Sequence, residues 1–157
     1  DFPLQNRDRL LSLLPSNSNL VLLDLIKEDW TSYVRSPIGF MSIDVDYYSS
    51  ATAVLENLST VRSALLLPNT LMYFDDIQLP EHNPFQGELL AIEEFNTTNA
   101  KRKIVPFGQV LRTTRRLKDA GWINQIFQLH VLDHIIRNQE YRSAYDPPKI
   151  ITNKYLK

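Results

Sequence analysis

The stretch Ile38-Gly-Phe-Met-Ser-Ile-Asp-Val-Asp46 decides the fold that we expect for this chain. Residues 38–43 are mostly apolar and show no regular alternation with polar residues. Such a run is typical of a parallel strand whose two faces are both covered by other parts of the protein. The run ends directly at two carboxylates, Asp44 and Asp46, so the sequence predicts a buried strand with an acidic pair at its carboxyl end.

A second apolar run repeats this pattern further along the chain. Residues 70–74 are predicted to form a strand that ends at Asp75 and Asp76. A spacing of 31 residues separates Asp44 from Asp75. This distance fits one strand–helix–strand unit, so we expect the two strands to be parallel and adjacent.

The segment between these two strands predicts a helix. Ser49 or Ser50 is expected to cap it, because a serine oxygen accepts an orphan amide of the first turn. Pro68 and Asn69 are expected to separate the helix from the next strand. The apolar stripe of the helix consists of Ala51, Val54, Leu55, Leu58, Val61 and Leu65. Other expected elements are helices at 4–14 and 88–96, strands at 20–23, 103–105 and 122–131, and an irregular tail beyond residue 145. Together they predict an α/β fold.

The composition excludes several classes of protein. The 157 residues include no cysteine, which excludes disulfides, zinc fingers and thiol nucleophiles. No apolar run approaches the roughly 18 residues of a membrane span, and no signal-peptide pattern is visible, so we expect a cytoplasmic protein without a membrane segment. The four glycines are far apart, which excludes a glycine-rich phosphate loop.

The charges are balanced over the chain but not along it. Residues 1–100 contain 5 Lys and Arg against 14 Asp and Glu, whereas residues 101–157 contain 12 against 4. One interpretation is that the two parts neutralise each other within one domain. The other is an anionic ligand or a nucleic-acid surface on the basic part, where Lys101-Arg102-Lys103 forms one cationic run. Aromatic residues are sparse there, which argues against nucleic-acid binding by stacking.

The chemistry that we expect lies at the strand ends, where ligands bind in open α/β sheets. Parallel neighbours would bring four carboxylates to one edge, and so many like charges need a cation or retained protons. Mg²⁺ is a suitable partner, since it prefers oxygen ligands. The alternative is that some of these carboxylates cap helices or line a solvated rim. The four are Asp44, Asp46, Asp75 and Asp76.

Three motifs resemble one protein family. They are residues 38–50 with the block Asp-Val-Asp-Tyr-Tyr-Ser-Ser, residues 71–77 with Phe-Asp-Asp, and residues 87–96. From about residue 1 to residue 134 the chain resembles an uncharacterised group of class I S-adenosylmethionine-dependent methyltransferase-like proteins, which is related to the macrocin O-methyltransferases. The resemblance implies a Rossmann-like, mostly parallel sheet with flanking helices.

The resemblance also implies roles for individual residues. In the macrocin-type enzymes the positions of Asp44, Asp75 and Asp76 hold Mg²⁺, and the position of Asp46 is the general base. Asp24, at the end of the expected strand 20–23, would contact the adenine of S-adenosylmethionine. An acceptor pocket for a small molecule with a hydroxyl group would be lined by Tyr47, Tyr48 and Glu88.

One departure from the family concerns the cofactor. The glycine-rich turn after the family's first strand and the acidic residue that ends its second strand are both absent. The resemblance makes residues 20–23 the third strand, so the sheet lacks the first two strands, and residues 1–157 correspond to the carboxy-terminal part of one methyltransferase-like domain. An unpaired sheet edge then favours a homo-oligomer.

Three other functions remain open at this stage. The chain fits a non-enzymatic methyltransferase-like remnant that serves as a binding or assembly domain. An Asp-x-Asp block also occurs in metal-dependent nucleotide-sugar glycosyltransferases and in phosphatases that use its first aspartate as a nucleophile. The 31-residue spacing between the two acidic pairs disfavours the phosphatases, and the glycosyltransferases do not require the second pair.

Overall fold

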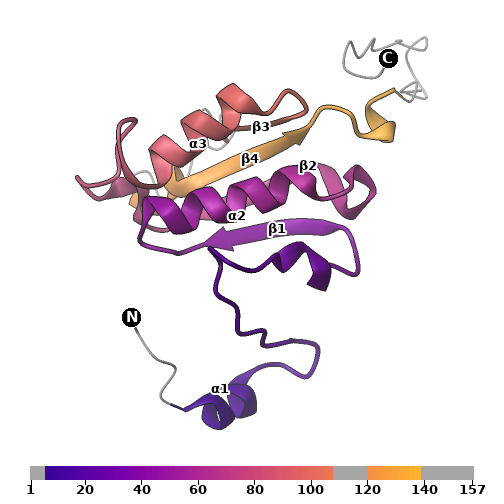
Figure 1. Ribbon diagram of the computed structural model, residues 1–157, viewed down its shortest axis with the longest axis vertical. Helices are drawn as coiled ribbons and strands as arrows, with labels where there is room; N and C mark the ends of the chain where they lie inside the picture. The colour runs from indigo at the N-terminus through magenta and orange to yellow at the C-terminus, as the bar shows by residue number, and fades with distance from the viewer. Residues whose placement is uncertain (1–5, 108–119, 139–157) are drawn as a thin grey trace.

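The structure is a computed structural model that describes residues 6–107 and 120–138 (Figure 1). Its helices are α1 (Arg7–Leu13), α2 (Tyr48–Thr60) and α3 (Gly87–Thr98). Its strands are β1 (Ile38–Ile43), β2 (Leu66–Phe74), β3 (Arg102–Pro106) and β4 (Ile126–Val131). Short 3-10 turns are η1 (Trp30–Tyr33), η2 (Ser63–Leu65), η3 (Asp76–Gln78), η4 (Gly121–Gln125) and η5 (Ile135–Asn138). The predicted α/β class is confirmed.

The strands form a four-stranded sheet in the order β1-β2-β4-β3. β1 and β2 are adjacent and parallel, as their spacing predicts. The expectation of a mostly parallel sheet is wrong for the described residues, because β4 runs antiparallel to both of its neighbours. The sheet is therefore mixed, and the parallel pair that carries the acidic residues lies on one side of it.

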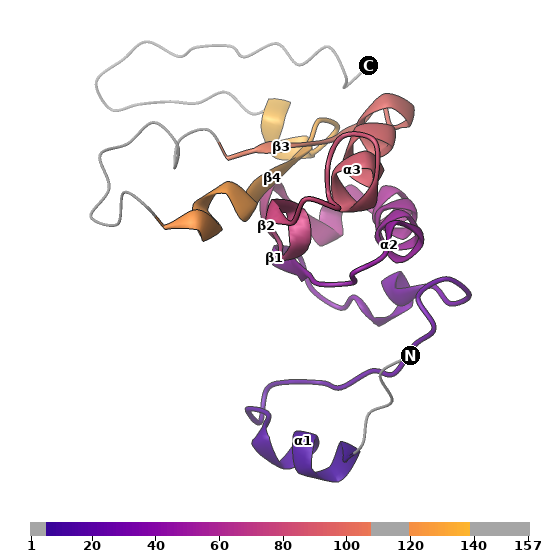
Figure 2. The same cartoon turned by 90° about the vertical axis from the view of Figure 1, so that its left-hand side faces the viewer.

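Two helices cover one face of this sheet. Figure 2 shows α2 and α3 side by side on the same face, and the two helices contact each other. α2 turns Ala51, Val54, Leu55 and Leu58 into the core, which confirms these members of the predicted stripe. Phe74 of β2 and Phe127 of β4 meet edge to face, with ring centroids 5.3 Å apart. This contact joins β2 to β4 within the core.

The predicted strand at residues 20–23 is wrong. These residues form no strand, and Val21 and Leu22 are 39% and 57% exposed. Among the described residues no neighbouring strand lies beside them, so their apolar side chains find no layer to pack against. A turn follows at once, in which the amides of Lys27 and Glu28 donate to the carbonyl of Asp24.

Two expectations near α2 are also wrong. The helix begins at Tyr48, one residue before the predicted serine caps, and Tyr47 at its N-cap makes no side-chain capping bond. β2 begins at Leu66 rather than at residue 70, so Pro68 lies inside the strand. The register shifts there, since Ile38 pairs with Leu66 but Phe40 pairs with Leu71. Proline lacks an amide hydrogen and is tolerated at such an irregularity.

The remaining predictions differ in extent. The predicted strand at 122–131 is shortened to β4, because η4 occupies its first half. α1 lies within the predicted helix at 4–14 but buries none of its residues, and Figure 1 shows it away from the sheet. The tail beyond residue 145 lies outside the described residues. Within residues 6–107 and 120–138, no helix has the length and apolarity needed to cross a membrane.

Candidate metal centre

Three carboxylates meet at the carboxyl edge of the parallel strand pair. Asp44 and Asp46 follow β1, and Asp76 opens η3 directly after β2. One oxygen from each residue lies within 4.8 Å of the oxygens of the other two. The strand ends are held together because the amide of Asp75 donates to the carbonyl of Ile43 at 3.1 Å. We refer to Asp44, Asp46 and Asp76 as the acidic group.

An unusual backbone conformation brings Asp46 into the acidic group. Asp46 has a φ of +54°, and it is the one non-glycine residue of the described chain with a positive φ. The amide of Tyr47 donates to the carbonyl of Val45 at 2.5 Å, which closes a three-residue turn around Asp46. A left-handed residue costs about 1–2 kcal/mol relative to the usual conformations, although aspartate tolerates it better than most residues do. Such strain is typical of functional positions.

Asp76 is the least exposed member of the acidic group. Its Oδ2 atom is buried and has no hydrogen-bond partner. Burial raises the pKa of Asp76, the charges of Asp46 and Asp44 raise it further, and the charge of His82 acts in the opposite direction. The three carboxylates therefore repel one another, and the site disfavours full ionisation unless a cation is bound.

A fourth carboxylate lies behind the acidic group. Glu88, in the first turn of α3, is 0% exposed, and neither of its carboxylate oxygens has a hydrogen-bond partner. Burial raises the pKa of Glu88 to about 7, and the charge of Asp76 adds to this effect. The backbone of Asp76 acts in the opposite direction and lowers the pKa of Glu88. Glu88 is thus the most strongly perturbed acid near the metal centre.

His82 and Gly87 fix the start of α3 and therefore the position of Glu88. The amide of Glu88 donates to Nδ1 of His82 at 3.1 Å, and His82 is 8% exposed. Gly87 has a φ of +67°, and a Cβ atom placed on it would lie 2.7 Å from Nδ1 and 2.8 Å from Cγ of His82. Only glycine combines this backbone conformation with so close an imidazole ring.

Gly87→Ala is therefore expected to lower the free energy of unfolding by about 2–4 kcal/mol, from the left-handed conformation and from crowding against His82. Urea unfolding followed by circular dichroism measures this loss. Gly39→Ala is the matched control, because a Cβ atom there would lie at an ordinary 3.5 Å from Leu67. Equal effects of the two substitutions would contradict the proposed role of Gly87.

Two of the predicted site residues lie outside the acidic group. The carboxylate of Asp75, predicted as a metal ligand, accepts a hydrogen bond from the hydroxyl of Tyr73 at 2.8 Å. Asp24, predicted to contact adenine, forms an ion pair with Lys27 at 2.6 Å and accepts from the amide of Ile26 at 3.1 Å. The hydrogen bond with Lys27 is the main reason that the pKa of Asp24 is lowered. The carboxylate of Asp24 thus stabilises the turn in which Asp24 lies.

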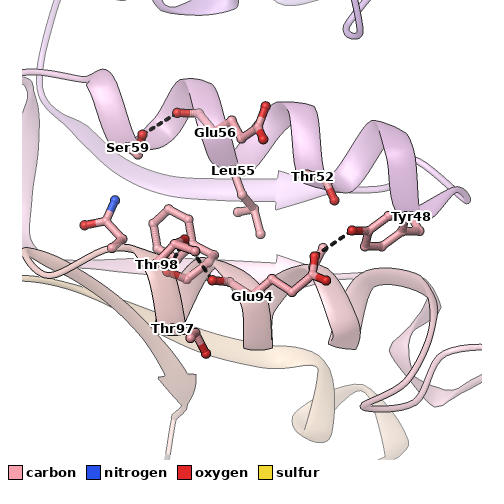
Figure 3. Close-up of a pocket in the computed structure, with 11 residues that line it drawn as sticks. Tyr48, Thr52, Leu55, Glu56, Ser59, Glu94, Thr97 and Thr98 are labelled. Atoms are coloured by element: carbon pink, nitrogen blue, oxygen red, sulfur yellow. Dashed lines mark hydrogen bonds between the residues drawn. The ribbon is translucent and has the colours of Figure 1, made fainter.

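The three predicted acceptor-pocket residues differ in their exposure and contacts. Tyr48 lines a groove of about 600 Å³ between α2 and α3, where its hydroxyl donates to Oε2 of Glu94 at 2.6 Å (Figure 3). This hydrogen bond is the main reason that the pKa of Tyr48 is raised. Tyr47 is 67% exposed, whereas Glu88 is fully buried. They are therefore in three different environments.

The sequence interpretation missed two features of the site. It placed Asp46 among four carboxylates at this edge but did not foresee that Asp46, and not Asp75, meets Asp44 and Asp76. It also missed that His82 supports Glu88 through the amide of that residue. The glycine directly before Glu88 was the available signal, because a glycine at the start of a helix often marks a left-handed or crowded position.

Comparison of the chain with models of known protein families, with curated proteins and with solved structures finds no match. The function is therefore inferred from the residues and their geometry, together with the resemblance of the motifs.

Proposed function

We propose that this chain carries the metal- and acceptor-binding side of a magnesium-assisted, S-adenosylmethionine-dependent O-methyltransferase. The observation that supports this most directly is the meeting of Asp44, Asp46 and Asp76 at the carboxyl edge of two adjacent parallel strands. This is the edge at which open α/β sheets bind ligands. The same residues belong to the motifs that resemble the methyltransferase family.

The acidic group fits a magnesium ion. All three side chains offer oxygen atoms, which Mg²⁺ prefers, and two of the three are exposed, so bound waters have room to complete the coordination. The buried Oδ2 atom of Asp76 lacks any partner, and a cation would supply one. A cation would also relieve the repulsion that raises the pKa of Asp76.

The residues of the acidic group divide into two roles. A bound magnesium ion lowers the pKa of a hydroxyl group that it coordinates. Asp44, at the carboxyl end of β1, and Asp76, at the start of η3, would coordinate the ion. Asp46 is exposed on its strained turn and lies close to both, and this supports a role in which its carboxylate would accept the proton that the acceptor hydroxyl loses.

The methyl donor follows from the resemblance alone. The described residues contain no glycine-rich turn, and Asp24 is engaged with Lys27 in its own turn. They do not fit S-adenosylmethionine as a binding site, and we derive no step that involves this cofactor.

Asp46→Asn and Asp44→Asn are expected to separate the two roles. Asp46→Asn should weaken magnesium binding by only about tenfold, the low end of the cost of losing an indirect partner of a metal, because two ligands remain and asparagine tolerates the left-handed backbone. It should nevertheless abolish the release of S-adenosylhomocysteine in an assay with hydroxyl acceptors. Asp44→Asn should lose the metal itself, which calorimetric titration with Mg²⁺ measures. Equal loss of magnesium binding in both variants would show that Asp46 is a ligand and not a base.

Calorimetry with S-adenosylhomocysteine on the full-length protein, including any glycine-rich turn that precedes residue 1, tests the enzymatic part of the proposal. Heat of binding would support a methyltransferase. Magnesium binding without any binding of S-adenosylhomocysteine would contradict it, and would favour the non-enzymatic reading of a methyltransferase-like domain that binds a metal.

A further inference from the structure

A second, basic groove lies at the opposite edge of the sheet. It has a volume of about 590 Å³ and is formed where α2 and α3 end, where β3 begins and just beyond the end of β4. Arg102 of β3 pairs with Val131 of β4 at this edge. We call it the amino-edge groove. It is separated from the acidic group by about the length of a strand, roughly 20 Å, and the two edges can be followed in Figure 1.

The charges that line the amino-edge groove do not balance. Arg62, Lys101 and Arg102 line it, against a single carboxylate, Asp133. Asp133 forms an ion pair with Arg102 and lies 4.0 Å from Nζ of Lys101. Within the described part of the chain, Arg62 has no carboxylate within ion-pair distance. The three cationic side chains exceed the one carboxylate by two positive charges, and the other residues that line the groove are neutral.

Arg102 supplies the second, independent observation. Its side chain is only 6% exposed and is held in place by three contacts. Its guanidinium donates to Asp133, to the carbonyl of Val61 and to the carbonyl of Lys101. Its Nε atom is buried, however, and has no hydrogen-bond partner. A buried cationic donor without an acceptor is costly, so Arg102 keeps an uncompensated polar group next to the groove that it lines.

The positive charge is not explained by the helix ends alone. The carbonyl groups at the end of a helix attract cations. The end of α2 already has a cationic partner, because Arg102 donates a hydrogen bond to the carbonyl of Val61. The end of α3 has one as well, because Lys103 donates to the carbonyl of Asn96. Arg62 and Lys101 are additional to these. The turn that presents Lys101 is preorganised, because Asn99 Oδ1 accepts from the amides of Lys101 and Arg102 at 3.1 and 2.9 Å.

We propose that the amino-edge groove binds a small tetrahedral oxyanion, the phosphate group of a free ion or of a small ester. Such a group brings several acceptor oxygens on one centre, which matches the charges of Arg62, Lys101 and Arg102 that line the groove. This assigns a location to the anionic ligand that the basic part of the sequence suggests. The site is independent of the acidic group and of the proposed methyl transfer.

Nuclear magnetic resonance on the ¹⁵N-labelled chain tests this proposal. The protein is titrated with inorganic phosphate in magnesium-free buffer, with chloride removed so that the ionic strength stays constant. The Nε–H signal of Arg102 and the amide signals of Ser63 and Lys101 are expected to shift with saturation. Sulfate should produce the same pattern, because it has the same geometry.

Arg62→Gln combined with Lys101→Gln should weaken phosphate binding at least about tenfold, since charge-assisted hydrogen bonds are worth at least that factor. Arg7→Gln combined with Arg9→Gln is the matched control. It removes the same charge from α1, which buries no residue, and it should leave binding unchanged. Circular dichroism checks that both double variants are folded.

Three results would overturn the proposal. One is the absence of saturable shifts with phosphate, and another is equal weakening in both double variants. The third is binding of a short single-stranded DNA without binding of inorganic phosphate, because that result would indicate a diffuse electrostatic surface rather than a discrete site.

Discussion

Asp76→Asn should weaken magnesium binding by at least about 100-fold, because loss of even an indirect partner of a metal costs about 10–100-fold in affinity. Asp76 contributes one of the three meeting carboxylates, and its buried Oδ2 atom has no other partner. Asp75→Asn should leave the affinity nearly unchanged, since the carboxylate of Asp75 lies outside the acidic group and accepts from Tyr73. Calorimetric titration of each variant with Mg²⁺ makes this comparison.

The same substitution provides its own control for folding. Burial and the charge of Asp46 raise the pKa of Asp76, so its ionised form is disfavoured in the metal-free fold. Removing that charge should therefore not lower the free energy of unfolding in magnesium-free buffer. If Asp76→Asn unfolds the chain, or if Asp75→Asn loses the metal equally, the acidic group as we define it is not the binding site.

Glu88→Gln should stabilise the metal-free protein at alkaline pH and change its dependence on pH. The pKa of Glu88 is raised from 4.5 to about 7 by burial and by the charge of Asp76. A raised pKa of an acid means that the native state keeps its proton longer than the unfolded state does. The stabilising contribution is complete below about pH 4.5 and is lost as the pH rises through about 7.

The difference between these two pKa values corresponds to at most about 3–4 kcal/mol. The wild-type chain should lose up to this amount of unfolding free energy between pH 4.5 and pH 8, relative to Glu88→Gln. Urea unfolding in magnesium-free buffer at several pH values measures it. Glu93→Gln is the matched control, because Glu93 lies on the same helix but is exposed. A pH profile that Glu88→Gln leaves unchanged would contradict the assignment.

The sequence was informative where a residue's environment follows from its neighbours along the chain. The run at 38–43 predicted the bounds of β1, since uninterrupted apolar residues followed by aspartate mark both the strand and its end. The 31-residue spacing predicted that β1 and β2 are parallel and adjacent. Both signals are local, and the packing of α2 on the sheet agrees with them.

The sequence was misleading where the outcome depends on distant parts of the chain. Residues 20–23 have the composition of a strand, but among the described residues no strand lies beside them. Pro68 suggested a break, yet the shifted pairing with β1 accommodates it inside β2. The acidic pairs seemed equivalent, whereas the backbone turn at Asp46 brings one aspartate in and the hydroxyl of Tyr73 engages another.

The left-handed turn at Asp46 makes it possible to distinguish selection for folding from selection for function at one position. A saturation library screened only for folded protein should retain glycine, asparagine and aspartate at this position, because these residues tolerate a positive φ. A library screened for catalysis should retain aspartate alone. The residues that survive the first screen but not the second would measure how far function, and not stability, determines what stands at the end of β1.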